Sequence, residues 1–355
     1  MKAMNCFAIY RLPHASHCTL VEQTSGEPLR LKSCTELDKV RGFVVAPFQI
    51  TDEQPIWVIR ADEVKRLECK SLSKESVQVG KLSSERTINA QLTSSYLSDF
   101  TRFHEQIAAG HFSKIVLARC RAIKRNETTS PLHLFQKACA LYPRLFIALA
   151  ALPDGTYWLA ATPEILLDGN GNEWHTVALA GTMQLQGDEL NGEGETARWS
   201  TKNIQEQRYV ASYIADCLEQ FAIDFKEEGP RTVRAANLVH LRSDFTFTLL
   251  NNARVGTLLQ ALYPTPAVCG LPKRKAFDFI VDNEHTPRQY YSGFMGPFGL
   301  NGETHLYVSL RCMQILADEY HLYAGGGLLK DSQMEQEWQE TEAKMQTMRQ
   351  LITES

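Results

Sequence analysis

The sequence predicts an α+β fold in which two antiparallel β-sheets pack face to face, with helices on the outside. Apolar, strand-like segments recur along the chain from residue 114 onwards. Short turns, such as Pro153-Asp154-Gly155, separate several of them, and such hairpin turns favour antiparallel pairing over crossover connections. Helical patterns are interleaved with the strands, which is typical of helices that cover the outer faces of sheets.

The N-terminal residues carry a weaker pattern than the rest of the chain. We expect residues 1–95 to form an N-terminal part of the sandwich, with weak strands at 42–48 and 55–61, and residues 96–355 to form a catalytic region within one compact domain. The elements expected in the middle of the chain are a helix at 96–110, a strand at 114–124, a helix at 131–143, strands at 146–152, 156–168 and 173–183, a helix at 199–221, a strand at 232–250 and a helix at 254–264.

The C-terminal part is expected to form a second meander followed by a helix. Its strands are predicted within 290–302, 304–316 and 320–329, and the acidic last segment has the apolar spacing of a helix with one buried stripe.

Composition excludes several classes of function. The net charge of −4 and the lack of a Lys/Arg-rich tract argue against nucleic acid as a partner. The longest apolar run, 145–152, is too short to span a membrane. The nine cysteines include no C-x-x-C pair, so we expect buried or free thiols of a reducing compartment and a cytoplasmic protein.

The last helix carries ionisable residues at the edge of its apolar stripe. A turn of about 100° per residue brings Glu337, Glu340 and Lys344 together there, while Glu335 and Glu342 are expected to face solvent. Carboxylates at a buried margin require a positive partner, and a hard divalent cation such as Mg²⁺ would suit them. The alternative is a solvated acidic face with a Glu340–Lys344 pair.

The helix at 199–221 places a carboxylate where its period predicts an apolar residue. Its stripe includes Val210 and Ile214, and four residues before Val210 stands Glu206. The nearest basic residue on the same helix is Lys202. A buried glutamate without a clear local partner indicates a functional site, so the two helices are expected to share one cation.

Two further ionisable residues lie next to apolar strands. Lys114 precedes Ile115-Val116-Leu117, and Glu164 precedes Ile165-Leu166-Leu167. Desolvation favours the neutral form of each group, which is the pairing that a base and an acid need at neutral pH. The alternative is that both residues lie at strand ends and reach water.

Seven segments give the chain a resemblance to the chorismate-utilising enzymes, most closely to their isochorismate synthase branch. They extend in order over roughly the last 250 residues. The segments are SKIVLAR (113–119), ATPEILL (161–167), ALAGT (178–182), HLRS (240–243), LYPTPAVCGLP (262–272), YSGFMGPFG (291–299) and GGGLLKDSQMEQEWQETEAK (325–344).

The resemblance implies a Mg²⁺-dependent, reversible conversion of chorismate to isochorismate and assigns roles by position. Lys114 would activate water and Glu164 would protonate the departing hydroxyl. Glu206 and Glu340 would bind Mg²⁺, with Glu337 in or next to its coordination shell. The residues implied in substrate binding are Thr182, His240, Thr265, Ala267, Tyr291, Arg311, Gly325, Gly326 and Lys344. No obligate protein partner is implied.

The chain departs from the family pattern at several positions. Residues 202–207 read Lys-Asn-Ile-Gln-Glu-Gln where Lys-Asp-Arg-x-Glu-His is usual, and Met183, Tyr263 and Gly326 replace a usual Arg, His and Ala. Lys114 and Ala180 stand where the branches of the family differ, and both favour water as the nucleophile. Two alternatives stay open: a salicylate synthase, which goes on to expel pyruvate, and an inactive family member that serves as a binding subunit.

Overall fold

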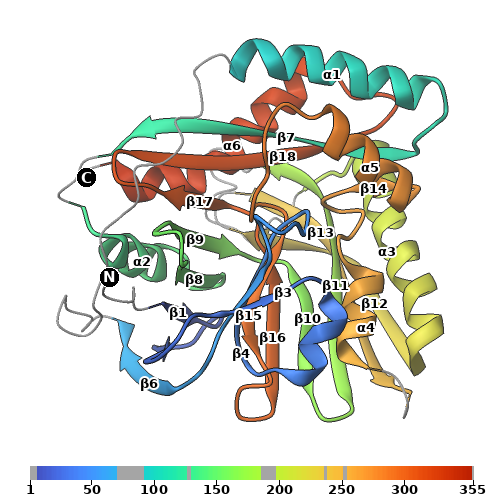
Figure 1. Cartoon of the computed structure of the whole chain (residues 1–355). Coiled ribbons are helices and arrows are strands. Elements are labelled where there is room, and N and C mark those ends of the chain that lie inside the picture. Colours follow the sequence, from blue (N-terminus) through green and yellow to red (C-terminus); the bar gives the residue numbers. More distant parts are fainter. Residues whose placement is uncertain are drawn as a thin grey trace.

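The computed structural model describes residues 6–69, 92–125, 129–184, 197–235, 238–250 and 254–353, and side chains of the second range from residue 95. Two antiparallel sheets form its framework (Figure 1). In the described residues the first sheet has nine strands in the order β14 (Gly270–Leu271), β7 (Lys114–Lys124), β18 (Glu319–Leu328), β17 (Cys312–Ile315), β9 (Tyr157–Thr162), β8 (Phe146–Ala151), β1 (Phe7–Arg11), β2 (His17–Glu22) and β6 (Glu63–Glu68).

The second sheet also has nine strands in the described part of the chain. Their order is β12 (Ala222–Ala235), β13 (Leu238–Leu249), β11 (Glu173–Gln184), β10 (Ile165–Asn170), β16 (Glu303–Val308), β15 (Phe294–Phe298), β4 (Gly42–Ala46), β5 (Ile56–Ile59) and β3 (Leu29–Leu31).

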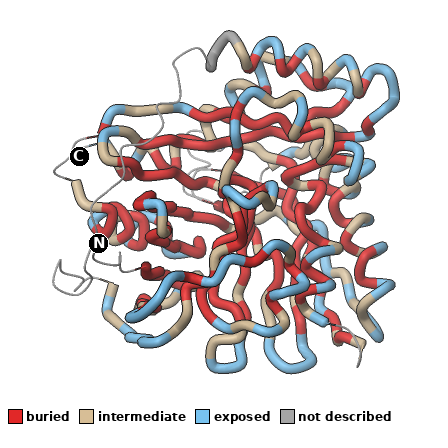
Figure 2. The backbone as a smooth tube through the Cα atoms, in the orientation of Figure 1, coloured by how far each residue is buried: buried red, intermediate tan, exposed pale blue. Residues whose placement is uncertain are grey.

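The sheets pack face to face through a buried aromatic layer. Phe146 of β8 stacks on Tyr307 of β16 with ring centroids 4.2 Å apart, and Tyr10 of β1 contacts Phe43 of β4 at 5.7 Å. Each pair joins one sheet to the other. The central strands, such as β8 and β9, are wholly buried, whereas the peripheral strands β6 and β12 are largely exposed (Figure 2). The predicted α+β sandwich is therefore confirmed.

Helices cover the outer faces. The second sheet carries α3 (Thr201–Phe221) and α4 (Val255–Leu262), and α4 also packs on the short 3₁₀ helix η1 (Cys34–Lys39). The first sheet carries α2 (Pro131–Leu141) and α6 (Met334–Ile352) on its outer face. At the β7 edge lie α1 (Leu92–Ala108) and α5 (Lys273–Asn283). No helix in the described residues is long and apolar enough to cross a membrane.

Several predicted elements need correction. The single strand expected at 232–250 is two strands, the end of β12 and β13, which pair as a hairpin. The runs 156–168 and 304–316 each divide into two strands that belong to different sheets. The helix at 273–283 was not among the expected elements; it packs on the β7 edge through the buried residues Ala276 and Ile280.

The N-terminal residues are part of both sheets, because β1, β2 and β6 join the first and β3, β4 and β5 the second. The expectation of free thiols throughout is wrong for two of the nine cysteines, all of which lie in the described ranges. Cys18 and Cys69 form a disulfide, whereas the other seven are free and buried. The sequence pattern missed this pair because a separation of 51 residues is bridged only by the β2–β6 pairing.

Candidate active site

The chain crosses from one sheet to the other at two adjacent places, and each crossing carries a buried ionisable residue. Glu164 lies between β9 and β10, and Arg311 lies between β16 and β17. The crossings run side by side because β9 pairs with β17 and β10 pairs with β16. The amide of Val308 donates to the carbonyl of Glu164 at 2.9 Å, and the amide of Ala161 donates to that of Arg311 at 3.0 Å.

This arrangement removes both side chains from water. Glu164 is 1% exposed and Arg311 is 5% exposed. Burial lowers the pKa of Arg311 to about 10, so the guanidinium is still charged at neutral pH. Arg311 has a φ of 45°, a left-handed backbone conformation that residues other than glycine seldom adopt. Such strain persists only where the surroundings enforce it, as at functional sites.

Glu164 is a carboxyl group held in its neutral form. Burial raises its pKa to about 8, even though the charges of Lys114, Arg311 and Lys344 all act to lower it. The Oε1 atom of Glu164 has no hydrogen-bond partner among the described residues. At neutral pH the side chain is therefore a protonated acid with a free oxygen, as the sequence predicted from its apolar surroundings.

Lys114 is fully buried at the start of β7, which excludes the alternative that it reaches water. Its Nζ lies 3.0 Å from Oε1 of Glu206, which projects from α3. Burial acts to raise the pKa of Glu206, but the charges of Lys114, Lys202 and Lys344 outweigh burial and leave that pKa below its usual value.

The glycine run of β18 provides the space for these groups. A Cβ on Gly327 would lie 2.7 Å from Cε of Lys114 and still closer to Oε1 of Glu206. A Cβ on Gly326 would meet Oε2 of Glu337 at 3.1 Å and Oε1 of Glu340 at 3.9 Å. The bare backbone of β18 thus forms the surface on which the carboxylates from α3 and α6 lie.

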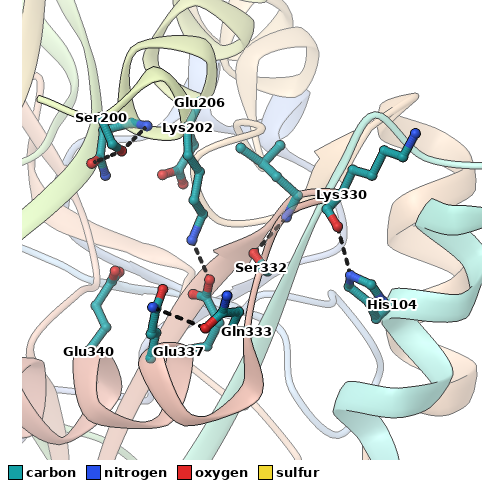
Figure 3. A network of polar contacts seen from close by, with 12 residues as sticks. His104, Ser200, Lys202, Glu206, Lys330, Ser332, Gln333, Glu337 and Glu340 are labelled. Atoms are coloured by element: carbon teal, nitrogen blue, oxygen red, sulfur yellow. Dashed lines mark hydrogen bonds and ion pairs between the residues drawn. The ribbon is translucent and has the colours of Figure 1, made fainter.

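Each of the three carboxylates has a lysine partner. Figure 3 shows Lys202 and Glu206 pointing from α3 toward Glu337 and Glu340 on α6. Lys202 forms an ion pair with Glu337, and Lys344 pairs with Glu340 at 2.7 Å. From the sequence, Lys202 was the nearest candidate partner of Glu206. In the folded chain Glu206 instead forms an ion pair with Lys114.

The carboxylates remain suitable for a hard cation. Oε2 of Glu337 is buried and has no hydrogen-bond partner among the described residues. Burial and the neighbouring Glu340 raise the pKa of Glu337, while Lys202 lowers it. Oxygen donors of this kind are the ligands that Mg²⁺ takes from proteins. Glu335 is exposed as expected, whereas Glu342 is not free in solvent, because it forms ion pairs with Arg119 and Arg349.

A histidine fixes the orientation of Arg311. Nη2 of Arg311 lies 2.7 Å from Nε2 of His240, and Nδ1 of His240 lies 3.0 Å from the carbonyl oxygen of Gly181. Gly181 has a φ of 72° at an irregularity of β11, where the backbone of Asn203 on α3 approaches closely. The other guanidinium nitrogen of Arg311, Nη1, has no partner among the described residues.

These groups surround a small cavity of about 50 Å³ between the sheets. The predicted residues that line it are Glu164, Thr182, Glu206, His240, Ala267, Tyr291, Arg311, Gly325 and Lys344. Lys114, Gly326, Glu337 and Glu340 do not line it. Lys114 and Glu340 contact its lining through their ion pairs with Glu206 and Lys344. Thr265 does not line it either: its carbonyl accepts from the amides of Val268 and Cys269 and so shapes the turn that carries Ala267.

Sequence reasoning missed several residues of the site. Lys202 was seen only as a neighbour of Glu206, although its position four residues earlier on the same helix was a signal. Gly181 gave no local signal that distinguished it from other glycines, and Gly327 stood out only as the last residue of the glycine run 325–327. Their roles depend on side chains from α3, which approach only in the folded chain.

A buried acid, a buried lysine and paired carboxylates around one cavity between two sheets are typical of an enzyme site for a small molecule. The chain belongs to the chorismate binding enzyme family, whose family model matches residues 41–353.

Curated relatives carry isochorismate synthase names. Isochorismate synthase EntC of Escherichia coli K12 is 28% identical over 244 residues, which cover 68% of this chain and 62% of the relative. Isochorismate synthase MenF of the same strain is 31% identical over 248 residues, or 69% of this chain and 57% of the relative. DhbC of Bacillus subtilis is 31% identical over 255 residues, or 68% and 64%. The matches thus span less than two thirds of these relatives.

Solved structures show the same fold over nearly the whole chain. A putative 2,3-dihydroxybenzoate-specific isochorismate synthase, DhbC, from Bacillus anthracis superposes with a TM-score of 0.82 at 23% identity, covering 99% of this chain and 96% of that one. MenF, the menaquinone-specific isochorismate synthase from Escherichia coli, gives 0.81 at 22% identity, covering 99% and 90%.

Proposed function

We propose that this chain is an isochorismate synthase, which interconverts chorismate and isochorismate. The observation that carries the proposal is the presence of a neutral Glu164 and a buried Lys114 at one cavity between the sheets. Membership of the family and the names of the relatives support chorismate as the substrate. Its product would supply menaquinone or siderophore synthesis in the cytoplasm.

In this proposal one residue accepts a proton from the attacking water and the other donates a proton to the leaving hydroxyl. Lys114, in its neutral amine form, accepts a proton from the water that adds at ring carbon 2, and the ring double bonds shift. Glu164 gives its proton to the hydroxyl at carbon 4, which leaves as water. A pKa of about 8 leaves Glu164 protonated at neutral pH and still able to release the proton during turnover.

The remaining groups hold the substrate. Arg311 presents an unpartnered Nη1, and Tyr291 and Lys344 line the same cavity. A charged guanidinium with free donors is well suited to a carboxylate.

Mg²⁺ would be held by Glu206 and Glu340, with Glu337 beside them, and would supply positive charge for a substrate carboxylate. The unpartnered Oε2 of Glu337 and the oxygen-only donor set support this assignment. Lys114, Lys202 and Lys344 balance the three carboxylates when no cation is bound.

The test is product analysis by chromatography after incubation with chorismate and Mg²⁺. We expect isochorismate in equilibrium with chorismate, no anthranilate when ammonium is abundant, and no activity in excess chelator. Glu340→Ala should abolish turnover, whereas Glu335→Ala, an exposed change on the same helix, should not. A lactate dehydrogenase assay follows pyruvate: steady pyruvate release with salicylate would make the protein a salicylate synthase, and no turnover would favour a binding subunit.

A further inference from the structure

Three cysteines gather far from the candidate active site, at a position that no part of the proposed reaction uses. Cys18 lies on β2, Cys69 directly follows β6, and Cys139 lies on α2. Their three sulfur atoms all lie within 4.8 Å of one another. Cys18 is fully buried and Cys139 is 8% exposed. The three sulfurs therefore form a cluster. The Cys18–Cys69 disulfide involves two of them and leaves the thiol of Cys139 beside it.

A thiophilic metal ion would use all three sulfurs. In tetrahedral zinc sites the Zn–S bonds are about 2.3 Å long, which places the sulfurs about 3.8 Å apart. Adjustments of about 1 Å would bring the three sulfurs of the dithiol form to that spacing. The elements that carry them are already packed together, because β2 pairs with β6 and Cys18 and Cys139 belong to one apolar cluster.

A second observation concerns Arg11 of β1. Its two terminal nitrogens donate to the carbonyls of Tyr142, Pro143 and Leu145 at 2.6–2.8 Å, whereas its buried Nε has no hydrogen-bond partner among the described residues. Cys139 is the ionisable neighbour of Arg11: burial raises the pKa of the Cys139 thiol to about 11, and the charge of Arg11 and its contact with the thiol oppose that rise. A metal-bound thiolate would give the buried guanidinium an anionic neighbour.

The third observation is an entry path. Cys69 and Cys139 line a cavity of about 1040 Å³ in the described part of the chain, and the side chains of His14, His17 and His133 line the same cavity. An ion can therefore reach the sulfurs, and water can complete the coordination from the cavity side.

We propose that Cys18, Cys69 and Cys139 form a thiolate site for a zinc ion when the Cys18–Cys69 pair is reduced. The ion joins α2 to the β2–β6 edge of the first sheet. Oxidation of the Cys18 and Cys69 thiolates to the disulfide, with loss of two electrons to an external disulfide or peroxide, removes two ligands and releases the ion. The site is independent of the proposed synthase reaction.

The test uses the whole chain, purified with a reductant and then exchanged into chelator-treated buffer. Titration with Co²⁺, the spectroscopic substitute for zinc, should give thiolate-to-cobalt charge-transfer absorption that saturates at one ion per chain. Zn²⁺ should displace the Co²⁺ and abolish that absorption. Treatment with diamide, which oxidises dithiols, should release the ion.

Two variants separate this site from adventitious thiol binding. Cys139→Ser should lower the affinity for Co²⁺ by about 100-fold, because one of three protein ligands is lost. The matched control is Cys217→Ser, since Cys217 is also a helical, buried, free cysteine at 6% exposure, and its affinity should equal that of the unsubstituted protein. Absence of the charge-transfer absorption in the reduced protein, or equal affinities in the two variants, would overturn the proposal.

Discussion

Arg311 and His240 form one hydrogen-bonded unit, with Nη2 of the arginine 2.7 Å from Nε2 of the histidine. A guanidinium only donates and a carbonyl only accepts, so Nε2 of His240 accepts from Arg311 while its Nδ1–H donates to Gly181. Burial, followed by the charge of Arg311, lowers the pKa of His240 well below its ordinary value. The imidazole is thus neutral, in one tautomer, and orients the arginine.

The first prediction concerns this orienting role. His240→Ala should raise KM for chorismate by about tenfold, because Arg311 loses the acceptor that aims it. The pH dependence of kcat should keep its shape, since a neutral His240 does not titrate near neutrality. Steady-state kinetics between pH 6 and 9 would measure both. His111→Ala, an exposed change, is the control; an unchanged KM in His240→Ala would refute the role.

The second prediction concerns Glu164 and stability. Its pKa is about 8 in the folded chain and near 4.5 when exposed, so between these values the folded state binds the additional proton. Stability therefore falls as pH rises from 4.5 to 8. Glu164→Gln removes this loss, so its melting temperature should exceed that of the unsubstituted protein by a margin of a few degrees that grows from pH 5 to pH 8.

Calorimetry across that range would measure the trend, with Glu335→Gln as an exposed control that shows none. The same Glu164→Gln protein should lose about 10²-fold or more in kcat, because an amide cannot protonate the leaving hydroxyl. A difference in melting temperature between Glu164→Gln and the unsubstituted protein that is constant with pH would show that Glu164 is ionised in the folded chain.

The third prediction compares two neighbouring glycines of β18. Gly327→Ala should lower kcat at least about 100-fold, because the new Cβ would displace the side chains of Glu206 and Lys114. Gly326→Ala should keep most of the activity, since its Cβ would meet the nearest carboxylate oxygen at 3.1 Å. Equal loss in both variants would mean that the strand itself, and not the space above Gly327, is sensitive.

The fourth prediction concerns Lys202. Lys202→Met leaves the buried Glu337 without its ion-pair partner, which should reduce the free energy of unfolding in chelator by about 3 kcal/mol. Mg²⁺ should then raise the melting temperature more than in the unsubstituted protein, with about tenfold tighter binding, because the lysine no longer competes for Glu337.

Differential scanning calorimetry across a Mg²⁺ titration measures both effects. The control is Lys65→Met, which removes an exposed pair with Glu22. Weaker Mg²⁺ binding in Lys202→Met would show that the lysine supports the cation site rather than competing with it.

The fifth prediction concerns Lys114. Lys114→Ala should lower kcat by about 10²-fold or more with little change in KM, because the lysine is assigned to activate water and not to hold the substrate carboxylates. Presteady-state and steady-state kinetics with chorismate would separate the two constants. Near-normal turnover would assign the base to another residue.

The sequence by itself determined the fold class and the residues that act as buried ionisable groups. Apolar patterning is local, and it placed Lys114 and Glu164 beside buried strands and Glu206, whose side chain is 12% exposed, at the margin of the apolar stripe of α3. It also gave the strand at 114–124 with the observed bounds, because continuous apolar residues and flanking helices define a buried strand.

Only the tertiary structure decided how these groups are paired. The partner of Glu206 is Lys114 from the opposite sheet, and the cysteine pair joins residues 51 positions apart. Neither contact can be predicted from the periodicity of apolar residues in the sequence. Likewise, Glu164 and Arg311 lie next to each other at the crossings between the sheets because the strands that flank them pair: β9 with β17, and β10 with β16. Which charged groups pair, and which side chains have room beside a glycine, depends on which helices and strands lie next to each other. The packing of the whole chain decides those neighbours.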